Sequence, residues 1–201
     1  MTFRTLAAAL VLSAAAGCAD GSAPVESLET PATEVAPWEV APSAAYESIV
    51  VGMNSLDVVT AETTESVARG STRDEAVAAL APYLGAPTSE SMNEECPLGP
   101  ALTAKWADGV SLLFEAVDGA STLTGWQVSG ADGRLRGPSG VALGMSRDAL
   151  LAQPDARLGD DGMLDNEFFV GAQDGVGGFL SGPDADARVT ELFVGTTCIA
   201  R

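Results

Sequence analysis

The stretch Gly70–Val77, with the sequence GSTRDEAV, recurs in the chain as GMSRDALL at Gly144–Leu151. Both copies place a hydroxyl residue, Thr72 or Ser146, directly before an Arg-Asp pair. Such a hydroxyl accepts a hydrogen bond from a free backbone N–H at the start of a helix, and an acidic residue in the first turn suits the positive end of the helix dipole. The stretches therefore predict two helix starts, the first with a capping box between Thr72 and Glu75.

The spacing of apolar residues after these starts sets the expected length of each helix. The first helix is predicted over residues 73–84 and ends at Gly85. Because Pro82 lies inside this span, the helix either kinks there or stops one turn early. The second helix is predicted from Arg147 to a point before Pro154. Three residues are expected on the buried face of the first helix: Val77, Leu80 and Leu84.

Short runs of apolar and β-branched residues predict strands on either side of the first helix. Asp108-Gly109 is a typical turn between two of these runs, whereas residues 88–100, which include Cys96, are expected to form a polar loop. Within the later strands, alternate residues should face the core: Val110, Leu112 and Phe114, then Trp126 and Val128, with Gln127 on the opposite face. The strand candidates are residues 49–51, 56–59, 103–106, 110–115 and 123–129.

Two further motifs recur in the same order downstream. Asp108-Gly109-Val110 corresponds to Asp174-Gly175-Val176, and Thr124-x-Trp126-x-Val128 corresponds to Thr190-x-Leu192-x-Val194. We therefore expect an α+β fold in which a helix followed by a three-strand antiparallel meander occurs twice, with the helices packed on antiparallel sheet. The halves would cover about 49–137 and 138–201. The alternative is that common capping and turn chemistry recurs without any duplication.

Charge and composition restrict the possible functions. Acidic residues outnumber basic ones 28 to 10, which gives a net charge of −18 and disfavours binding to nucleic acid. The chain has no histidine, which excludes Ser-His-Asp and Cys-His catalysis and histidine-ligated zinc. Lys105 is its only lysine. These features predict that the protein is not an enzyme and holds neither a cofactor nor a metal.

Residues 1–17 combine a basic residue, Arg4, with an apolar run that is shorter than the ~20 residues needed to span a bilayer. Small residues follow and lead directly to Cys18. This leader resembles a bacterial lipoprotein signal peptide, in which the cysteine takes a diacylglycerol and becomes the mature N-terminus. Ala15 stands where that family usually has leucine. The alternative is an ordinary secretory leader, which would leave Cys18 as a free thiol.

Residues 18–48 are rich in Ala, Pro, Ser, Thr and Glu, which predicts a disordered, partly extended spacer. From Ala19 to Ala68 there are acidic residues but no basic one, so the spacer should stay off an anionic membrane. Trp38 is either a docking point for a partner or incidental. The predicted domains are thus a signal peptide over 1–17, a spacer over 18–48 and a globular region over 49–201.

The other two cysteines, Cys96 and Cys198, are the candidate pair for a disulfide in an exported protein. Such a bond would join the two halves and fix the segment at Cys198. Two free buried thiols are the alternative.

The helix starts, together with Leu84-Gly85-Ala86-Pro87, resemble the short α+β repeats of two families, the SmpA/OmlA-type envelope lipoproteins and the β-lactamase inhibitor proteins. This resemblance covers residues 70–87 and 144–151 only, and no contact residue carries over. The order of lipid-modified cysteine, acidic spacer and cysteine-linked repeats is also similar to that of lipoproteins from high-GC bacteria.

Dense acidic groups are the only other candidate sites. Paired carboxylates can serve glycoside hydrolysis or hold calcium, but residues 160–165 lack the ligand spacing of an EF-hand loop. Residues 175–178, GVGG, lack the following helix and lysine of a phosphate-binding loop, and they predict a tight strand. Four aromatic residues are expected in the core rather than in a ligand site: Trp106, Phe114, Trp126 and Phe179. The acidic groups are Glu94-Glu95 and the cluster Asp160, Asp161, Asp165 and Glu167.

Taken together, these observations predict a membrane-anchored lipoprotein on the extracytoplasmic side of a bacterial cell. Its expected function is non-catalytic: a scaffold or binding module whose sheet face engages an envelope protein or a peptide. The alternative is a small carboxylate-dependent hydrolase or a calcium-binding envelope protein.

Overall fold

The computed structural model describes residues 42, 44–96, 99–117, 119–159, 166–171 and 175–198. All of them belong to one unit of the chain, Val35–Arg201. Several sequence predictions lie outside the described residues: the leader, Cys18, Trp38 and most of the spacer, together with Asp160, Asp161, Asp165 and Asp174.

A four-stranded sheet is built mainly from the residues that precede the first helix. Its order is β3-β2-β1-β8, with β1 antiparallel to β2 and parallel to β8. In β2, Leu56 and Val58 are buried and alternate with partly exposed residues, because successive side chains of a strand point to opposite faces. The strands are β1 (Ser48–Val51), β2 (Ser55–Val59), β3 (Thr64–Ala68) and β8 (Leu135–Arg136).

Helix α1 (Arg73–Leu84) begins and ends where the sequence predicts. Thr72 and Glu75 form the expected capping box, and the chain leaves the helix at Gly85, whose φ of 72° favours glycine. The helix continues through Pro82 to Leu84, so it does not stop a turn early. Its buried residues are Ala76, Leu80 and Leu84, whereas Val77 is only partly buried.

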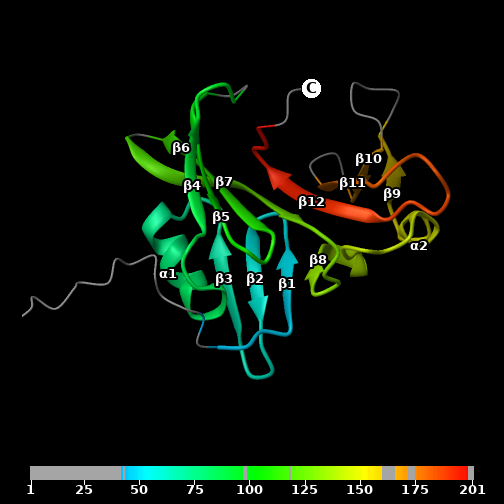
Figure 1. Cartoon of the computed structure of the whole chain (residues 1–201), viewed down its shortest axis with the longest axis horizontal. Helices are drawn as coiled ribbons and strands as arrows, with labels where there is room; N and C mark the ends of the chain where they lie inside the picture. The colour runs from blue at the N-terminus through cyan, green and yellow to red at the C-terminus, as the bar shows by residue number, and fades with distance from the viewer. Residues whose placement is uncertain are drawn as a thin grey trace, which may run out of the picture. The chain divides into compact units, whose positions relative to one another are not determined.

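An eight-stranded sheet forms the rest of the structure, with all neighbouring strands antiparallel (Figure 1). Its order is β4-β5-β6-β7-β12-β11-β10-β9. Helix α2 (Arg147–Leu151) precedes β9, and Ser146 caps it by accepting a hydrogen bond from the Ala149 N–H. A short 3-10 turn, η2 (Pro138–Gly140), follows β8. The strands are β4 (Ser89–Asn93), β5 (Ala101–Lys105), β6 (Val110–Val117), β7 (Ala120–Ser129), β9 (Ala156–Leu158), β10 (Glu167–Val170), β11 (Val176–Leu180) and β12 (Val189–Gly195).

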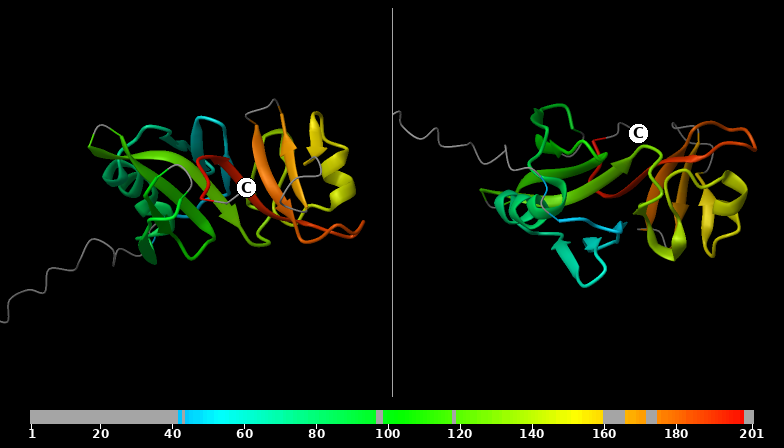
Figure 2. Two further views of the ribbon diagram at one scale, coloured as in Figure 1. Left: turned by 90° about the horizontal axis from the view of Figure 1, so that it is seen from above. Right: turned by 60° about the horizontal axis from the view of Figure 1, so that its bottom comes forward.

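The large sheet consists of two four-strand meanders. The first meander, β4–β7, and the second meander, β9–β12, join where β7 pairs with β12. Figure 2 shows the first meander in green and the second in yellow to red, with the red β12 next to the first meander.

The predicted fold class, α+β with a repeated helix and three-strand meander, is wrong. The described chain is mostly β, with two sheets and only two α-helices, and α2 has five residues. The four-stranded sheet belongs to neither predicted repeat, and each meander has four strands. The sequences of β3 (TESVA) and β4 (SESMN) are polar, so they lack the apolar alternation that marks a strand. The predicted loop at 88–100 therefore contains β4.

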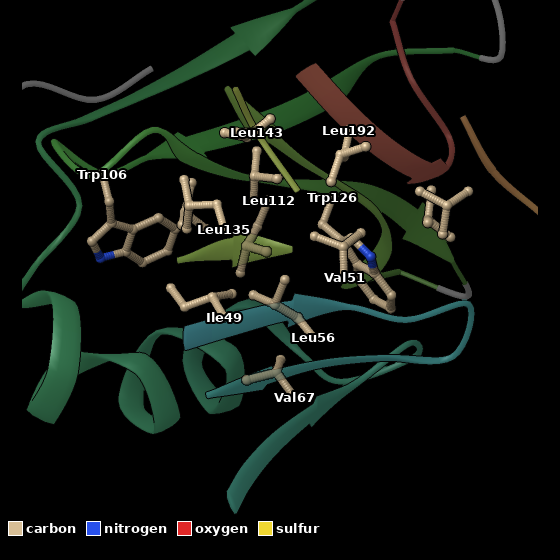
Figure 3. Packing of buried hydrophobic residues seen from close by; sticks show 14 of the residues in the cluster. Ile49, Val51, Leu56, Val67, Trp106, Leu112, Trp126, Leu135, Leu143 and Leu192 are labelled. Atoms are coloured by element: carbon tan, nitrogen blue, oxygen red, sulfur yellow. The ribbon is translucent and has the colours of Figure 1, made fainter. Parts of the chain in front are cut away.

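The hydrophobic core lies between the two sheets, and α1 covers part of it (Figure 3). We call the core side of the large sheet its inner face and the opposite side its outer face. Ile49 and Leu56 of the small sheet lie opposite Leu112 and Trp126 of the large sheet, and all four are fully buried. The predicted inward residues of β6 and β7 are confirmed as buried: Val110, Leu112, Phe114, Trp126 and Val128.

A disulfide joins Cys96, in the loop after β4, to Cys198, beyond the end of β12. Their Cα atoms are 4.7 Å apart and the two residues are separated by 102 positions in sequence. The predicted pairing is confirmed. The bond ties the end of the second meander to the beginning of the first.

Candidate binding face

The side chains on the outer face of the large sheet point away from the core. One register row crosses all eight strands on this face, with one cation at its second position and another at its last. Neighbouring residues in the row are directly opposite each other on adjacent strands, so their side chains lie close together. From β4 to β9 the row is Ser89, Lys105, Ser111, Gln127, Phe193, Gly177, Phe169 and Arg157.

The first meander carries a pocket on this face, with a volume of about 370 Å³. Leu113 lies on the outer face but is only 3% exposed, so it forms an apolar floor. Lys105 and several uncharged polar side chains surround it, and no carboxylate lines the pocket. Its lining residues are Ser91, Met92, Asn93, Thr103, Lys105, Leu113, Gln127 and Cys198.

The second meander carries an aromatic cluster on the same face, formed by Phe169, Phe179 and Phe193. The ring centroids of Phe179 and Phe193 are 5.5 Å apart, with an interplanar angle of 39°. The Arg157 guanidinium lies 5.2 Å from the centre of the Phe169 ring, which is within cation–π range. Arg157 also donates a hydrogen bond to the Gly171 carbonyl at 3.0 Å. Phe169 and Phe193 occupy the same register row with Gly177 between them, so the two groups lie on neighbouring strands of one face.

Two glycines of β11 allow aromatic rings to lie directly on the backbone. A Cβ at Gly177 would collide with the Phe193 ring on the outer face, and a Cβ at Gly178 would collide with the Phe168 ring on the inner face. The GVGG sequence therefore serves a strand, as predicted, and its glycines accommodate packing on both faces.

Glu191 lies between the pocket and the aromatic cluster, at a half-buried position of β12. Burial raises the pKa of its carboxyl group, because desolvation disfavours the charged form, and a hydrogen bond from the Gln127 side chain partly opposes this effect. The same bond fixes the orientation of Gln127 beside the pocket.

The predicted acidic sites do not assemble in the described residues. Glu94 and Glu95 lie in the turn after β4, where the Glu95 N–H donates to the Asn93 side chain at 3.0 Å. Glu167 lies on β10, and the rest of its predicted cluster is outside the described residues. Within those residues, no group of three or more His, Cys, Asp and Glu side chains could hold a metal ion.

The aromatic predictions are correct for three residues and wrong for one. Trp106, Phe114 and Trp126 lie in the core, and the Trp106 indole N–H donates to the Gly85 carbonyl at 3.0 Å. Phe179 instead lies on the outer face, partly buried against Phe193. The sequence analysis also missed Phe193, although Leu192 and Val194 on either side are core residues, and this alternation places Phe193 outward.

The N-terminal end of the described chain lies beside α1, on the core side of the large sheet. The Ala44 N–H donates to the Pro82 carbonyl of α1 at 2.8 Å, and the Tyr46 hydroxyl donates to Asp108 at 2.7 Å. The Arg134 guanidinium lies 4.7 Å from the centre of the Tyr46 ring. Burial, followed by the hydrogen bond to Asp108, raises the pKa of Tyr46 and keeps its hydroxyl protonated as a donor. These contacts anchor the N-terminal end of the described chain beside α1.

None of the helices in the described part of the chain has the length and apolar content needed to cross a membrane.

Comparison of the chain with protein-family models, with curated proteins and with solved structures found no match.

Proposed function

We propose that this protein is a lipoprotein of the bacterial cell envelope, anchored on the extracytoplasmic side through a lipid on Cys18. Its function is non-catalytic: it binds an envelope protein or a peptide through the outer face of the large sheet. The leader that ends in Cys18 supports the lipid anchor, and the Cys96–Cys198 disulfide is consistent with an oxidising compartment outside the cytoplasm.

The observation that carries the binding function is the composition of the outer face. Rings of Phe169 and Phe179, the cations Lys105 and Arg157 in the same row, and an adjacent pocket give the mixture of aromatic, charged and polar groups that is enriched at protein interfaces. A carboxylate-dependent hydrolase would instead need two carboxylates converging on a pocket, and the pocket over the first meander has none.

The place where the described chain begins also supports this proposal. The described chain begins beside α1, on the core side of the large sheet. The described chain therefore begins away from the outer face, which suits a protein that presents this face to a partner.

In vivo photo-crosslinking would test the proposal. A photoreactive amino acid replaces Phe179 in one strain and the exposed Glu65 of β3 in another, and crosslinked partners are identified by mass spectrometry. We expect one discrete partner from position 179 and none from position 65. Identical crosslinking patterns at both positions would rule out the outer face as the binding surface.

Two variants give the matched quantitative test. Phe179→Ala removes an aromatic ring from the outer face, whereas Leu151→Ala removes an exposed apolar side chain from α2. We expect the first to weaken capture of the crosslinked partner by at least about tenfold and the second to leave it unchanged. The mass of the N-terminal peptide tests the anchor separately, since an unmodified Cys18 would contradict lipidation.

A further inference from the structure

The pocket over the first meander differs in charge from the rest of the protein. The chain has 28 acidic and 10 basic residues, yet no carboxylate lines the pocket and the only lysine does. We propose that this pocket binds the carboxylate group of a ligand of amino-acid size, with Lys105 as its counter-ion. This inference rests on the proposed function and names a subsite within the proposed binding face.

The ammonium group of Lys105 is available to a ligand. In the described part of the chain Lys105 takes no part in an ion pair, whereas Arg73 pairs with Asp74 and Glu90, and Arg134 pairs with Asp132. The backbone of Lys105 is held in place, because both the N–H and the hydroxyl of Thr88 donate to its carbonyl, at 2.7 and 3.0 Å. The charge therefore projects from a fixed point at the end of β5.

Other polar side chains of the pocket leave donors free for a carboxylate. The Asn93 side-chain oxygen already accepts the Glu95 N–H, which leaves the Asn93 amide nitrogen as a free donor. The Ser91 and Thr103 hydroxyls line the same pocket and can each donate one hydrogen bond. A carboxylate accepts about four hydrogen bonds, and these three groups together with Lys105 provide that number of donors.

The floor and the size of the pocket define the rest of the ligand. Leu113 is buried at the floor and offers a ligand an apolar contact beneath the polar groups. A volume of about 370 Å³ lies at the small end of known ligand pockets, and it fits one apolar residue with its carboxylate.

A single ammonium suits a ligand with one negative charge. A phosphate monoester carries about two charges and is commonly held by arginine, which this pocket lacks. The net charge of −18 repels anions at long range, but at physiological salt this field is screened over about 8 Å. The groups that line the pocket therefore decide what binds. Carboxylates of this kind occur at the C-terminus of a peptide and in free acylated amino acids.

The unique lysine provides a direct test. Reductive methylation of the full chain with ¹³C-formaldehyde labels Lys105 and the N-terminal amine and keeps the positive charge. N-acetyl-leucine, a peptide with a free C-terminal leucine, and the same peptide with an amidated C-terminus are then titrated while the Lys105 resonance is followed by NMR. We expect both free carboxylates to shift this resonance at millimolar concentration, and the amidated peptide to bind at least about tenfold more weakly.

Substitutions at Lys105 supply the second readout, which is measured by calorimetry with the same three ligands. Lys105→Met should weaken the binding of free carboxylates about tenfold or more, whereas Lys105→Arg should retain most of it. Arg136→Met on β8, away from the pocket, is the matched control and should bind normally. Equal binding of N-acetyl-leucine and the peptide would identify a small acid as sufficient, and binding of the peptide alone would identify a chain terminus.

Two results would overturn the inference: a Lys105 resonance that no carboxylate shifts, or equal affinity for the free and amidated peptides. If discrete crosslinking from position 179 persists in either case, the proposed binding face is still supported and only the carboxylate subsite is rejected. If carboxylates bind but position 179 yields no partner, the proposed protein-binding function fails instead.

Discussion

The two meanders of the large sheet share a strand order but differ on their outer faces. Each follows a capped helix and runs as four antiparallel strands toward the central pair β7 and β12. The first meander carries a polar pocket with Lys105, whereas the second carries the aromatic cluster of Phe169, Phe179 and Phe193. The inner faces of both contribute apolar residues to one core.

This difference shows that the two faces of one sheet are under different constraints. Side chains alternate between the faces of a strand, so every second residue is constrained by the core. The remaining residues are free to differ between the meanders, and here they provide a charged polar pocket and an apolar surface side by side.

The two helices also differ. Helix α1 has twelve residues and contacts β3 and β7, whereas α2 has five residues and contacts β9, a three-residue strand at the edge of the sheet. We therefore expect the first half to depend more strongly on its helix than the second. Substitutions in the disulfide and in the two helices should reveal this difference in stability between the halves.

The largest effect is expected from the disulfide, which connects the two meanders. In the chain-entropy model, closing a loop of this length stabilises a protein by roughly 4–5 kcal/mol. The double variant Cys96→Ala/Cys198→Ala should lose about this much free energy of unfolding, as measured by urea denaturation. Cys18→Ala is the matched cysteine control and should keep the stability of the parent protein. An unchanged midpoint for the double variant would mean that the meanders hold together without the bond.

Truncation of one buried leucine in each helix compares the two halves directly. Leu80 of α1 and Leu150 of α2 are both fully buried, so the transfer contribution is the same. Leu80→Ala should cost about 3–5 kcal/mol and Leu150→Ala about 2–3 kcal/mol, since the edge of the sheet can relax around the smaller side chain. Thermal unfolding measures both, and a larger loss at Leu150 would reverse the proposed asymmetry.

The helix caps should show the same order with smaller effects. Thr72 makes a reciprocal capping box with Glu75, whereas Ser146 caps through a single hydrogen bond of 3.3 Å from the Ala149 N–H. Thr72→Ala should cost about 1–2 kcal/mol and Ser146→Ala about 0.5–1 kcal/mol in urea denaturation. Replacement by Ser at 72 and by Thr at 146 keeps a capping oxygen and serves as the control. Equal losses would indicate that the second bond of the capping box adds nothing.

The smallest effect is expected at Glu191, on the central strand β12 between the pocket and the aromatic cluster. Its folded-state pKa is raised by burial, so ionisation costs folding free energy at pH values above that pKa. Below its ordinary pKa of 4.5 the group is protonated in both states and the cost disappears. Glu191→Gln should therefore raise the Tm slightly at pH 7 and not at pH 3.5, while Glu94→Gln in an exposed turn should change neither value. A Tm difference that is the same at both pH values would contradict a desolvated carboxylate.

The sequence predicts local structure accurately where the chemistry is local. Both helix starts, the end of α1 at Gly85 and the stop of α2 before Pro154 follow from capping and backbone rules that involve only neighbouring residues. The inward residues of β6 and β7 follow from alternation, and the disulfide follows from the two cysteines that remain once Cys18 is set apart.

The errors occur where partners distant in sequence decide the structure. β3 and β4 are polar strands that exist because β2 and β5 provide hydrogen-bond partners. Phe179 has the composition of a core residue, but it faces outward because Gly178 and Leu180 take the inner positions beside it on β11. The candidate site could be predicted only in part: the unique lysine is visible in the sequence, but its pocket is not.

The sequence alone determined the helix starts and stops, the alternation of the central strands, the pairing of Cys96 with Cys198, and the exclusion of histidine-based chemistry. The tertiary structure decided that strands dominate, that two sheets enclose one core, and that Lys105 and the aromatic cluster share the outer face. Local rules act between residues a few positions apart, whereas sheet order and the sharing of a face are set by hydrogen bonds between strands far apart in the chain.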